Sequence, residues 1–273
     1  MDSQTSNALW YVYGIVSASF SPATLPSGID DAEVRLERGD EVAALVSVLE
    51  GAPYNTRALE MNSGDVEWLS PRAVEHDRVL TWASDLGPVV PLPMFSLFSG
   101  REAIQDMLRD REAELVPLLQ RLGKGREYAL RVYRVDRELM ASMTSLSPHL
   151  ADLEAAAASA SPGQRYLLER KLEAEKKNEM RGVSQQIVDD VVRGLGAHAI
   201  QSKRVAIAGP DDAAASRGVM ILDSAFLVAP DQLEAFQQTL TSIVDRYSAN
   251  GLRFDFTGPW PPYHFASEAD RGA

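Results

Sequence analysis

Histidines and acidic residues are the side chains of this 273-residue chain that could do chemistry, because the chain contains no cysteine. Disulfides, thiolate metal sites and cysteine nucleophiles are therefore excluded. The histidines are spread along the sequence, and none has a partner at metal-ligand spacing; they are His76, His149, His198 and His264. His76 falls on the apolar face of an expected helix, which favours a structural histidine with satisfied hydrogen bonds.

Paired carboxylates and glycine motifs add no catalytic candidate. Acidic pairs occur at Asp30-Asp31, Asp189-Asp190 and Asp211-Asp212, and the last pair would be at best a weak cation site in a loop. In a chain with a net charge of -12, surface acids are mostly solvated. Gly194-Leu195-Gly196 lacks the third glycine of a dinucleotide fingerprint, and no Walker loop or nucleophile elbow occurs. The sequence predicts no catalytic residue, cofactor or metal.

Composition and charge narrow the class of partner. The chain is 45% hydrophobic and 24% charged, which is typical of a folded globular protein. Its negative charge disfavours nucleic acid and anionic membranes. No apolar stretch is long enough to span a bilayer. The N-terminus has no basic region followed by an apolar segment, which predicts a cytoplasmic protein. Small molecules and other proteins remain as partners.

The first half of the chain predicts an α+β domain over residues 1–123. We expect a buried strand over residues 9–16 and a hairpin centred on Gly39-Asp40. Ser70-Pro71 predicts the start of a helix, with serine as the N-cap. Residues 99–102 predict a second helix with a capping box. Between the helices, the two prolines of residues 89–95 predict an edge strand or an extended link.

The second half predicts a ferredoxin-like domain over residues 124–273, beginning after Gly123-Lys124-Gly125. Its elements follow the order strand, helices, strand, strand, helix, strand, which is the βαββαβ arrangement with a helical-hairpin insertion at about residues 136–195. The charged segment 164–193 could instead form an oligomerising coiled coil. Lys176 and Glu179 interrupt its heptad seam, which favours an intramolecular hairpin.

Two apolar, proline-rich segments are the candidate partner-binding sites. Residues 258–265 hold three prolines and three aromatic residues, which makes a stiff segment of large apolar area. Such a segment is either a strap that closes the core or a docking site; the strap is favoured, and the two roles can coexist. The predicted partner-binding residues are Pro91, Met94, Phe95, Phe98, Trp260, Pro261, Pro262 and Tyr263.

The C-terminal segment 256–265, Phe-Thr-Gly-Pro-Trp-Pro-Pro-Tyr-His-Phe, resembles the terminal signature of the gas vesicle protein F/L family. The strand at residues 9–15, the Gly39-Asp40 hairpin and the helix at residues 75–80 fit that family in the same order. Family members usually follow the Pro-Leu of the mid-chain motif with Arg-Phe-Gly-Thr. Here residues 93–96 read Pro-Met-Phe-Ser, so the arginine and the glycine are lost. This departure predicts an altered partner surface.

The resemblance implies a non-enzymatic assembly factor or minor component of the gas vesicle. Such a protein would bind the small shell protein, could also bind other accessory proteins of the vesicle, and would limit shell aggregation during vesicle nucleation. It would act in the cytoplasm or on the vesicle. The resemblance also implies two domains, the second ferredoxin-like. A ligand-sensing regulatory protein is the alternative, because a fold does not fix a function. An enzyme would need a cluster of titratable groups for which the sequence offers no candidates.

Overall fold

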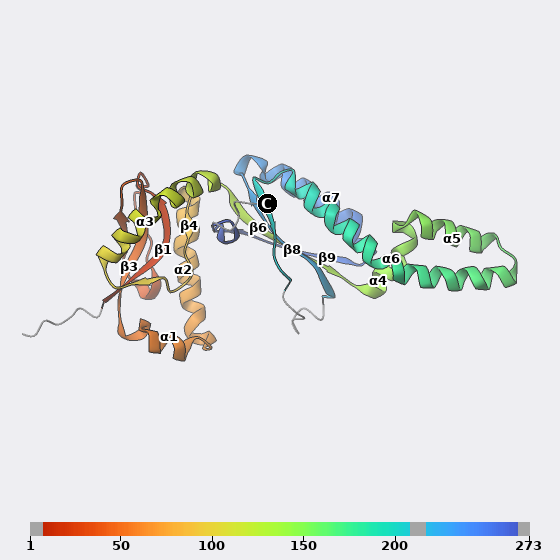
Figure 1. Ribbon diagram of the computed structural model, residues 1–273, viewed down its shortest axis with the longest axis horizontal. Coiled ribbons are helices and arrows are strands. Elements are labelled where there is room, and N and C mark those ends of the chain that lie inside the picture. The colour runs from red at the N-terminus through yellow and green to blue at the C-terminus, as the bar shows by residue number, and fades with distance from the viewer. Residues whose placement is uncertain (1–7, 208–216, 267–273) are drawn as a thin grey trace, which may run out of the picture. The chain divides into compact units, whose positions relative to one another are not determined.

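The computed structural model describes residues 8–207 and 217–266, and within them the chain divides into two compact units (Figure 1). The first unit consists of the described residues of Met1–Glu127 and Pro259–Ala273, and the second of those of Tyr128–Gly258. The division falls four residues after the predicted boundary at residue 123. The sequence pattern assigns the C-terminal tail to the second domain, whereas the structure groups it with the first unit. The tail is held on the first unit by contacts between residues far apart in sequence. Such contacts cannot be predicted from a local sequence pattern.

The first unit contains an antiparallel sheet in the order β2-β3-β1-β4, and β5 also pairs with β1. β2 and β3 form the hairpin predicted around Gly39-Asp40, and β4 is the predicted edge strand. Its strands are β1 (Ala8–Ser17), β2 (Val34–Arg38), β3 (Val42–Glu50), β4 (Val90–Pro91) and β5 (Leu97–Phe98). Its helices are α1 (Thr56–Asn62), α2 (Val66–Leu86) and α3 (Arg101–Leu122), with short turns η1 (Ile29–Asp31), η2 (Ala52–Tyr54) and η5 (Tyr263–Phe265).

Strand β1 is buried on both faces. Successive side chains of a strand point to opposite faces, so full burial of consecutive residues requires a cover on each side. Helix α2 covers one face through Val79, Leu80 and Ala83, which pack with Tyr11 and Tyr13. Helix α3 contacts β1, β2 and β3 with its own set of buried leucines and covers the other face. The β1 residues with 0% exposure are Tyr11, Val12, Tyr13, Ile15 and Val16.

Two predicted helix starts are wrong. Helix α2 begins at Val66, where Asp65 Oδ1 accepts hydrogen bonds from the backbone N–H groups of Glu67 (3.0 Å) and Trp68 (3.2 Å). Pro71 lies inside the helix, where it removes one backbone donor near the N-terminal end. Helix α3 begins at Arg101 with Gly100 as N-cap and no side-chain cap, so the predicted capping box does not form. Ser99 stands one residue outside the N-cap position and cannot reach the free N–H groups.

The second unit contains a sheet in the order β7-β8-β6-β9. Helices α5 and α6 each begin where a Ser-Pro pair interrupts the helical pattern of the sequence, at Ser147-Pro148 and Ser161-Pro162. The β-branched pattern of the sequence predicts a strand at residues 203–208, but strand β7 runs from Gln201 to Arg204, and residue 208 lies outside the described residues. The elements are β6 (Arg126–Arg134), α4 (Asp136–Leu146), α5 (Pro148–Ser159), α6 (Pro162–Gly196), β7 (Gln201–Arg204), β8 (Val219–Val228), η3 (Pro230–Gln232), α7 (Leu233–Tyr247), η4 (Ser248–Asn250) and β9 (Leu252–Trp260).

Aromatic side chains form the centre of the second unit's core. The rings of Tyr128 and Phe256 stack with centroids 5.4 Å apart, and those of Phe226 and Phe236 meet edge to face at 5.4 Å. The C-terminal half of α6 joins this core, while its N-terminal half packs against α5 as a helical arm (residues 148–182; Figure 1). The charged segment thus packs within its own chain. Among the described residues, no helix is long and apolar enough to cross a membrane.

Candidate functional site

The C-terminal tail is anchored to the first unit by a buried carboxylate. Glu127, whose side chain is 3% exposed, accepts a hydrogen bond from the backbone N–H of His264 (2.8 Å) through Oε2. Its Oε1 lies 2.5 Å from His264 Nδ1. Nearby, the Tyr263 hydroxyl donates to Asp77 of α2 (3.2 Å). Burial and the adjacent Asp77 raise the pKa of Tyr263. Pro261, Pro262 and Phe265 are buried, so this stretch lies as a strap on the first unit.

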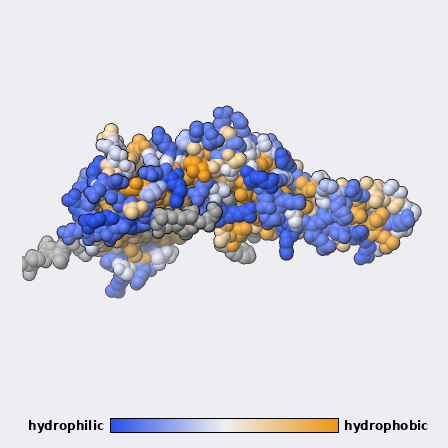
Figure 2. Space-filling model, turned by 45° about the horizontal axis from the view of Figure 1, so that its top comes forward, coloured by the Kyte–Doolittle hydropathy of each residue, from blue (hydrophilic) through white to orange (hydrophobic). Residues whose placement is uncertain are grey.

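One residue of the tail instead faces an open groove beside α2, here called the α2 groove. The groove has a volume of about 700 Å³ and is lined by Trp260 together with Ala73, Val74, Asp77, Arg78, Thr81, Trp82 and Asp85. Val74 is 68% exposed and Trp260 is 41% exposed. Elsewhere, the face seen in Figure 2 is mostly hydrophilic, with hydrophobic side chains in small groups. An exposed indole beside exposed aliphatic side chains on a helix is suited to an apolar partner.

The mid-chain segment is less accessible than the tail. Pro91 is buried in β4 opposite Gly14, and Met94 and Phe98 are partly buried. The Phe95 ring stacks on Trp68 with centroids 5.4 Å apart and meets Tyr11 edge to face at 6.3 Å. Of the predicted partner-binding residues, Trp260 and Tyr263 are therefore the two with large exposed hydrophobic side chains.

Phe95 has a left-handed backbone, with φ of 65°. This is the position at which the family noted above usually carries glycine, the residue that adopts positive φ without strain. A non-glycine residue there costs about 1–2 kcal/mol. The stack on Trp68 and a hydrogen bond from the Phe95 backbone N–H to the Tyr11 hydroxyl (3.1 Å) offset that cost. In this chain an aromatic contact and a hydrogen bond thus hold Phe95 in a backbone conformation that glycine adopts more readily.

Replacing Phe95 should reverse the usual order of alanine and glycine. Both variants lose the aromatic stack, but only glycine relieves the backbone. We expect Phe95→Gly to be more stable than Phe95→Ala by about 1 kcal/mol in urea denaturation. The same pair at Val74, inside helix α2 and exposed, is the matched control, where glycine should be less stable than alanine by about 1 kcal/mol. If alanine is the more stable of the two variants at both positions, the backbone of Phe95 is not strained.

His76 lies in a buried hydrogen-bonded cluster with two tyrosines. Its Nδ1 accepts from the Tyr11 hydroxyl (2.7 Å), and its ring stacks on Tyr13 with centroids 5.7 Å apart. The Tyr13 hydroxyl donates to Ser47 Oγ (3.0 Å) and accepts from the backbone N–H of Ile29 (2.9 Å). Burial lowers the pKa of His76 to about 4, only partly opposed by the backbone of Leu92. His76 is therefore neutral at pH 7. Its buried Nε2 has no hydrogen-bond partner among the described residues, so the prediction of satisfied hydrogen bonds holds for Nδ1 alone.

This depressed pKa predicts acid sensitivity of the first unit. In the unfolded chain His76 should titrate near 6.5, so below that pH the unfolded state binds a proton that the folded state does not. The His76 contribution to stability is full above pH 6.5 and is lost as the pH falls toward 4. Between pH 7 and pH 5 the loss should be about 2 kcal/mol. Urea denaturation at several pH values should compare the wild type with His76→Gln, which keeps an acceptor for Tyr11. Only the wild type should lose the His76 contribution to the free energy of unfolding. If the two proteins lose stability in parallel as the pH falls, His76 is not the cause.

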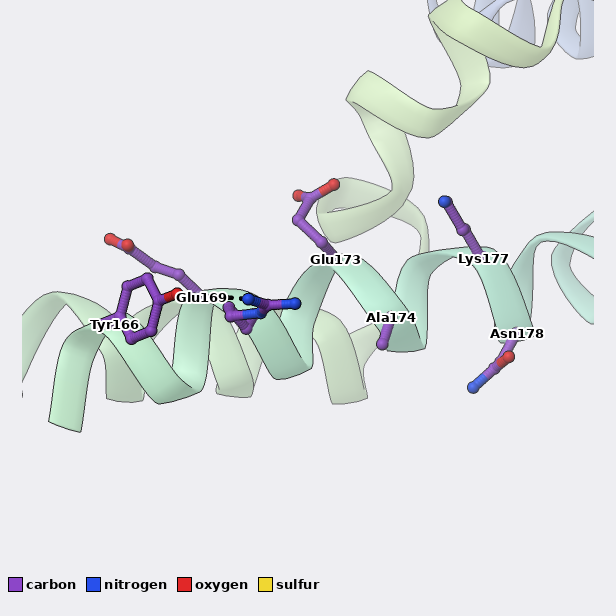
Figure 3. A pocket seen from close by; sticks show the side chains of 7 residues that line it. Tyr166, Glu169, Glu173, Ala174, Lys177 and Asn178 are labelled. Carbon is purple, nitrogen blue, oxygen red and sulfur yellow. Dashed lines mark hydrogen bonds between the residues drawn. The ribbon is translucent and has the colours of Figure 1, made fainter.

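Two of the acidic residues singled out in the sequence form ion pairs in the structure. Asp30 binds Arg72 (3.0 Å), and Asp189 pairs with Arg204 (2.9 Å), which helps to lower the pKa of Asp189. Asp211-Asp212 lies outside the described residues. A pocket of about 610 Å³ on α6 is lined by residues of that helix alone. Figure 3 shows its side chains fanning out along successive turns, with Tyr166 bonded to Arg170 (3.2 Å). These groups do not converge on a common point.

Two solved structures of gas vesicle proteins have a similar fold. GvpF from Anabaena sp. PCC7120 has a TM-score of 0.66 at 20% identity, covering 95% of this chain and 98% of that one. GvpF from Microcystis aeruginosa has a TM-score of 0.63 at 20% identity, covering 95% and 99%.

The sequence comparisons lead to the same group. Gas vesicle protein L of Streptomyces sp. (strain CB03234) is 28% identical, over 97% of this chain and 96% of its own length. Gas vesicle protein L2 of Halobacterium salinarum (strain ATCC 700922 / JCM 11081 / NRC-1) is 27% identical, over 94% and 91%. The family described as gas vesicle synthesis protein GvpL/GvpF matches residues 9–267. The chain therefore belongs to the gas vesicle synthesis protein GvpL/GvpF family.

Proposed function

We propose that this protein is a gas vesicle assembly factor that binds the small shell protein and limits its aggregation while the vesicle nucleates, without catalysing a reaction. Membership of the GvpL/GvpF family supports a gas-vesicle-associated role. A shell subunit with one apolar face and open strand edges would aggregate before it assembles, so it needs a protein that covers these surfaces. A protein that covers this face for a time would prevent the aggregation.

The observation that carries the proposal is the α2 groove. Trp260 is exposed on the groove, while the residues after it are fixed by Pro261, Pro262 and the bond between His264 and Glu127. A large aromatic side chain on a fixed backbone loses little conformational entropy when it binds. Asp77, Arg78 and Asp85 supply a charged rim around the apolar centre, which is how protein-binding patches are built. Strap and docking site are thus two roles of one tail.

Covering an apolar face is favoured over strand addition. The edge strand β2 carries charged residues in ion pairs, Arg35 with Glu33 (2.7 Å) and Glu37 with Arg101 (2.7 Å). At the opposite edge, β4 has two residues and ends in proline. In the other sheet, the edge strand β7 has four residues, and the edge strand β9 contains Pro259 near its end. Short, charged or proline-containing edges discourage pairing with another chain.

The test is an aggregation assay with purified shell protein, followed by light scattering. Equimolar wild-type protein should slow aggregation, and Trp260→Ala should bind the shell protein at least about ten times more weakly, as expected for a hot-spot aromatic residue. Tyr166→Ala, which removes an aromatic residue 58% exposed on the arm, is the matched control and should behave as wild type. If the wild type has no effect, the function is rejected. If Trp260→Ala protects as well as wild type, the groove is rejected.

We also propose that the second unit is a ferredoxin-like domain enlarged by the α4–α6 insertion. Numbered along the chain, its strands stand in the sheet in the order 2-3-1-4. Strands 2 and 3, β7 and β8, are antiparallel neighbours. Helices connect strand 1 to strand 2 and strand 3 to strand 4. This order supports a split βαβ arrangement.

A further inference from the structure

We propose that the helical arm holds a divalent metal site formed by His149 of α5 with Glu175 and Glu179 of α6. Each of the three residues offers a ligand atom, and these atoms all lie within 4.8 Å of one another. Glu175 and Glu179 are one helical turn apart, so their side chains lie on the same face of α6. His149 reaches that face from the facing helix. This site does not depend on the proposed binding of the shell protein.

A buried hydroxyl orients one of the ligands. Ser147 Oγ donates to Glu179 Oε2 (2.5 Å) while it caps α5 by accepting from the backbone N–H of Leu150 (3.3 Å). Ser147 is 7% exposed, so the bond to Glu179 is shielded from water. The other oxygen, Oε1, is left facing His149 Nε2 at 3.8 Å. Hydrogen bonds that orient a metal-binding carboxylate in this way are characteristic of metal sites.

The spacing of the atoms fits a metal better than a direct contact. At 3.8 Å, Nε2 and Oε1 are too far apart for a hydrogen bond. Two ligand atoms at zinc-bond lengths, set at the tetrahedral angle, lie about 3.3 Å apart. Closing the cluster around an ion therefore needs shifts of about 0.5–1.5 Å, within reach of side-chain rotation. The His149 side chain is 56% exposed and free to make that adjustment.

The two carboxylates of the cluster would also be stabilised by a bound cation. Two carboxylates at positions i and i+4 of a helix repel each other. Within residues 8–207 and 217–266, no lysine or arginine forms an ion pair with Glu175 or Glu179. One imidazole and two carboxylates are ligands suited to Zn²⁺ or another divalent transition ion, whereas Mg²⁺ and Ca²⁺ prefer oxygen ligands throughout. With three protein ligands, further coordination positions remain for water.

Calorimetric titration of the EDTA-treated full chain with ZnCl₂ at pH 7 tests the site. We expect one saturable site per chain, weakened at least about tenfold in both His149→Ala and Glu175→Gln, because each loses a ligand. His198→Ala and Glu169→Gln remove the same residue types elsewhere in the second unit and should bind zinc as wild type does. Zinc should also slow proteolysis of the turn between α5 and α6 in wild type and not in Glu175→Gln. Absence of saturable binding, or wild-type affinity in His149→Ala, would overturn the site.

Discussion

Replacing His264 by alanine is expected to destabilise the first unit by about 3 kcal/mol. Glu127 is buried, with its side chain 3% exposed, and the imidazole of His264 lies 2.5 Å from its Oε1. The variant keeps the backbone N–H of residue 264 but removes the imidazole, so a buried carboxylate loses one of its partners. A buried charge left in this way is among the costly defects in a folded protein.

The four tryptophans make this prediction easy to measure. Trp10, Trp68, Trp82 and Trp260 all belong to the first unit, so tryptophan fluorescence reports on that unit alone. The urea midpoint followed by fluorescence should fall in His264→Ala. Glu127→Ala combined with His264→Ala should cost less than the sum of the single variants, because the second change removes the stranded charge. Additive costs would show that the two residues do not form an energetic pair.

Replacing Phe236 by alanine should destabilise the second unit by about 3–5 kcal/mol. Phe236 has 0% exposure, and its ring lies between Phe226 (5.4 Å), Phe256 (6.1 Å) and Tyr128 (6.2 Å). Alanine would leave a cavity among these rings and would release helix α7 from the sheet. This is the usual mechanism behind large losses in cores.

For this variant the two spectroscopic signals should separate. Far-UV circular dichroism, which senses both units, should show an early loss of helix in urea. Tryptophan fluorescence should keep the wild-type midpoint, because the second unit contains no tryptophan. Tyr166→Ala, at an exposed position of α6, should change stability by no more than about 0.5 kcal/mol. A shift of both signals together would mean that the units unfold as one.

Much of the fold is predictable because the spacing of apolar residues and the residues that end helices are visible in short stretches of sequence. The apolar face of α7, with Phe236, Leu240, Ile243 and Tyr247, is buried as its spacing predicts. Gly251 follows the helix with φ of 82°, a conformation that glycine supplies at helix ends. The start of α2 was harder to predict, because proline is tolerated within the early turns of a helix as well as at its first position. Asp65 caps the helix, but no proline follows it, so the sequence does not mark this residue as the helix start.

The candidate sites depend on contacts that local patterns do not carry. The composition of the tail singles out Trp260 and Tyr263, but not Val74 and Trp82, which share the α2 groove with Trp260. In the sequence Glu127 is an ordinary strand residue, and its role becomes visible only through its hydrogen bond with His264 in the structure. The sequence spacing of the histidines predicts no metal site. His149 meets Glu175 and Glu179 only because α5 folds back along α6, and the turn between the helices sets which residues face each other.

The return of the chain to the first unit bears on how the protein is made. A ribosome releases residues 128–258 before it releases the strap, so the second unit can fold during synthesis while the first still lacks its last piece. Glu127 then has no histidine partner until residue 264 has left the ribosome. A released variant that ends at residue 258 would carry a complete second unit beside a first unit that lacks the strap. Loss of the strap, residues 261–265, would accordingly destabilise the first unit, although that unit is encoded mostly by the start of the gene.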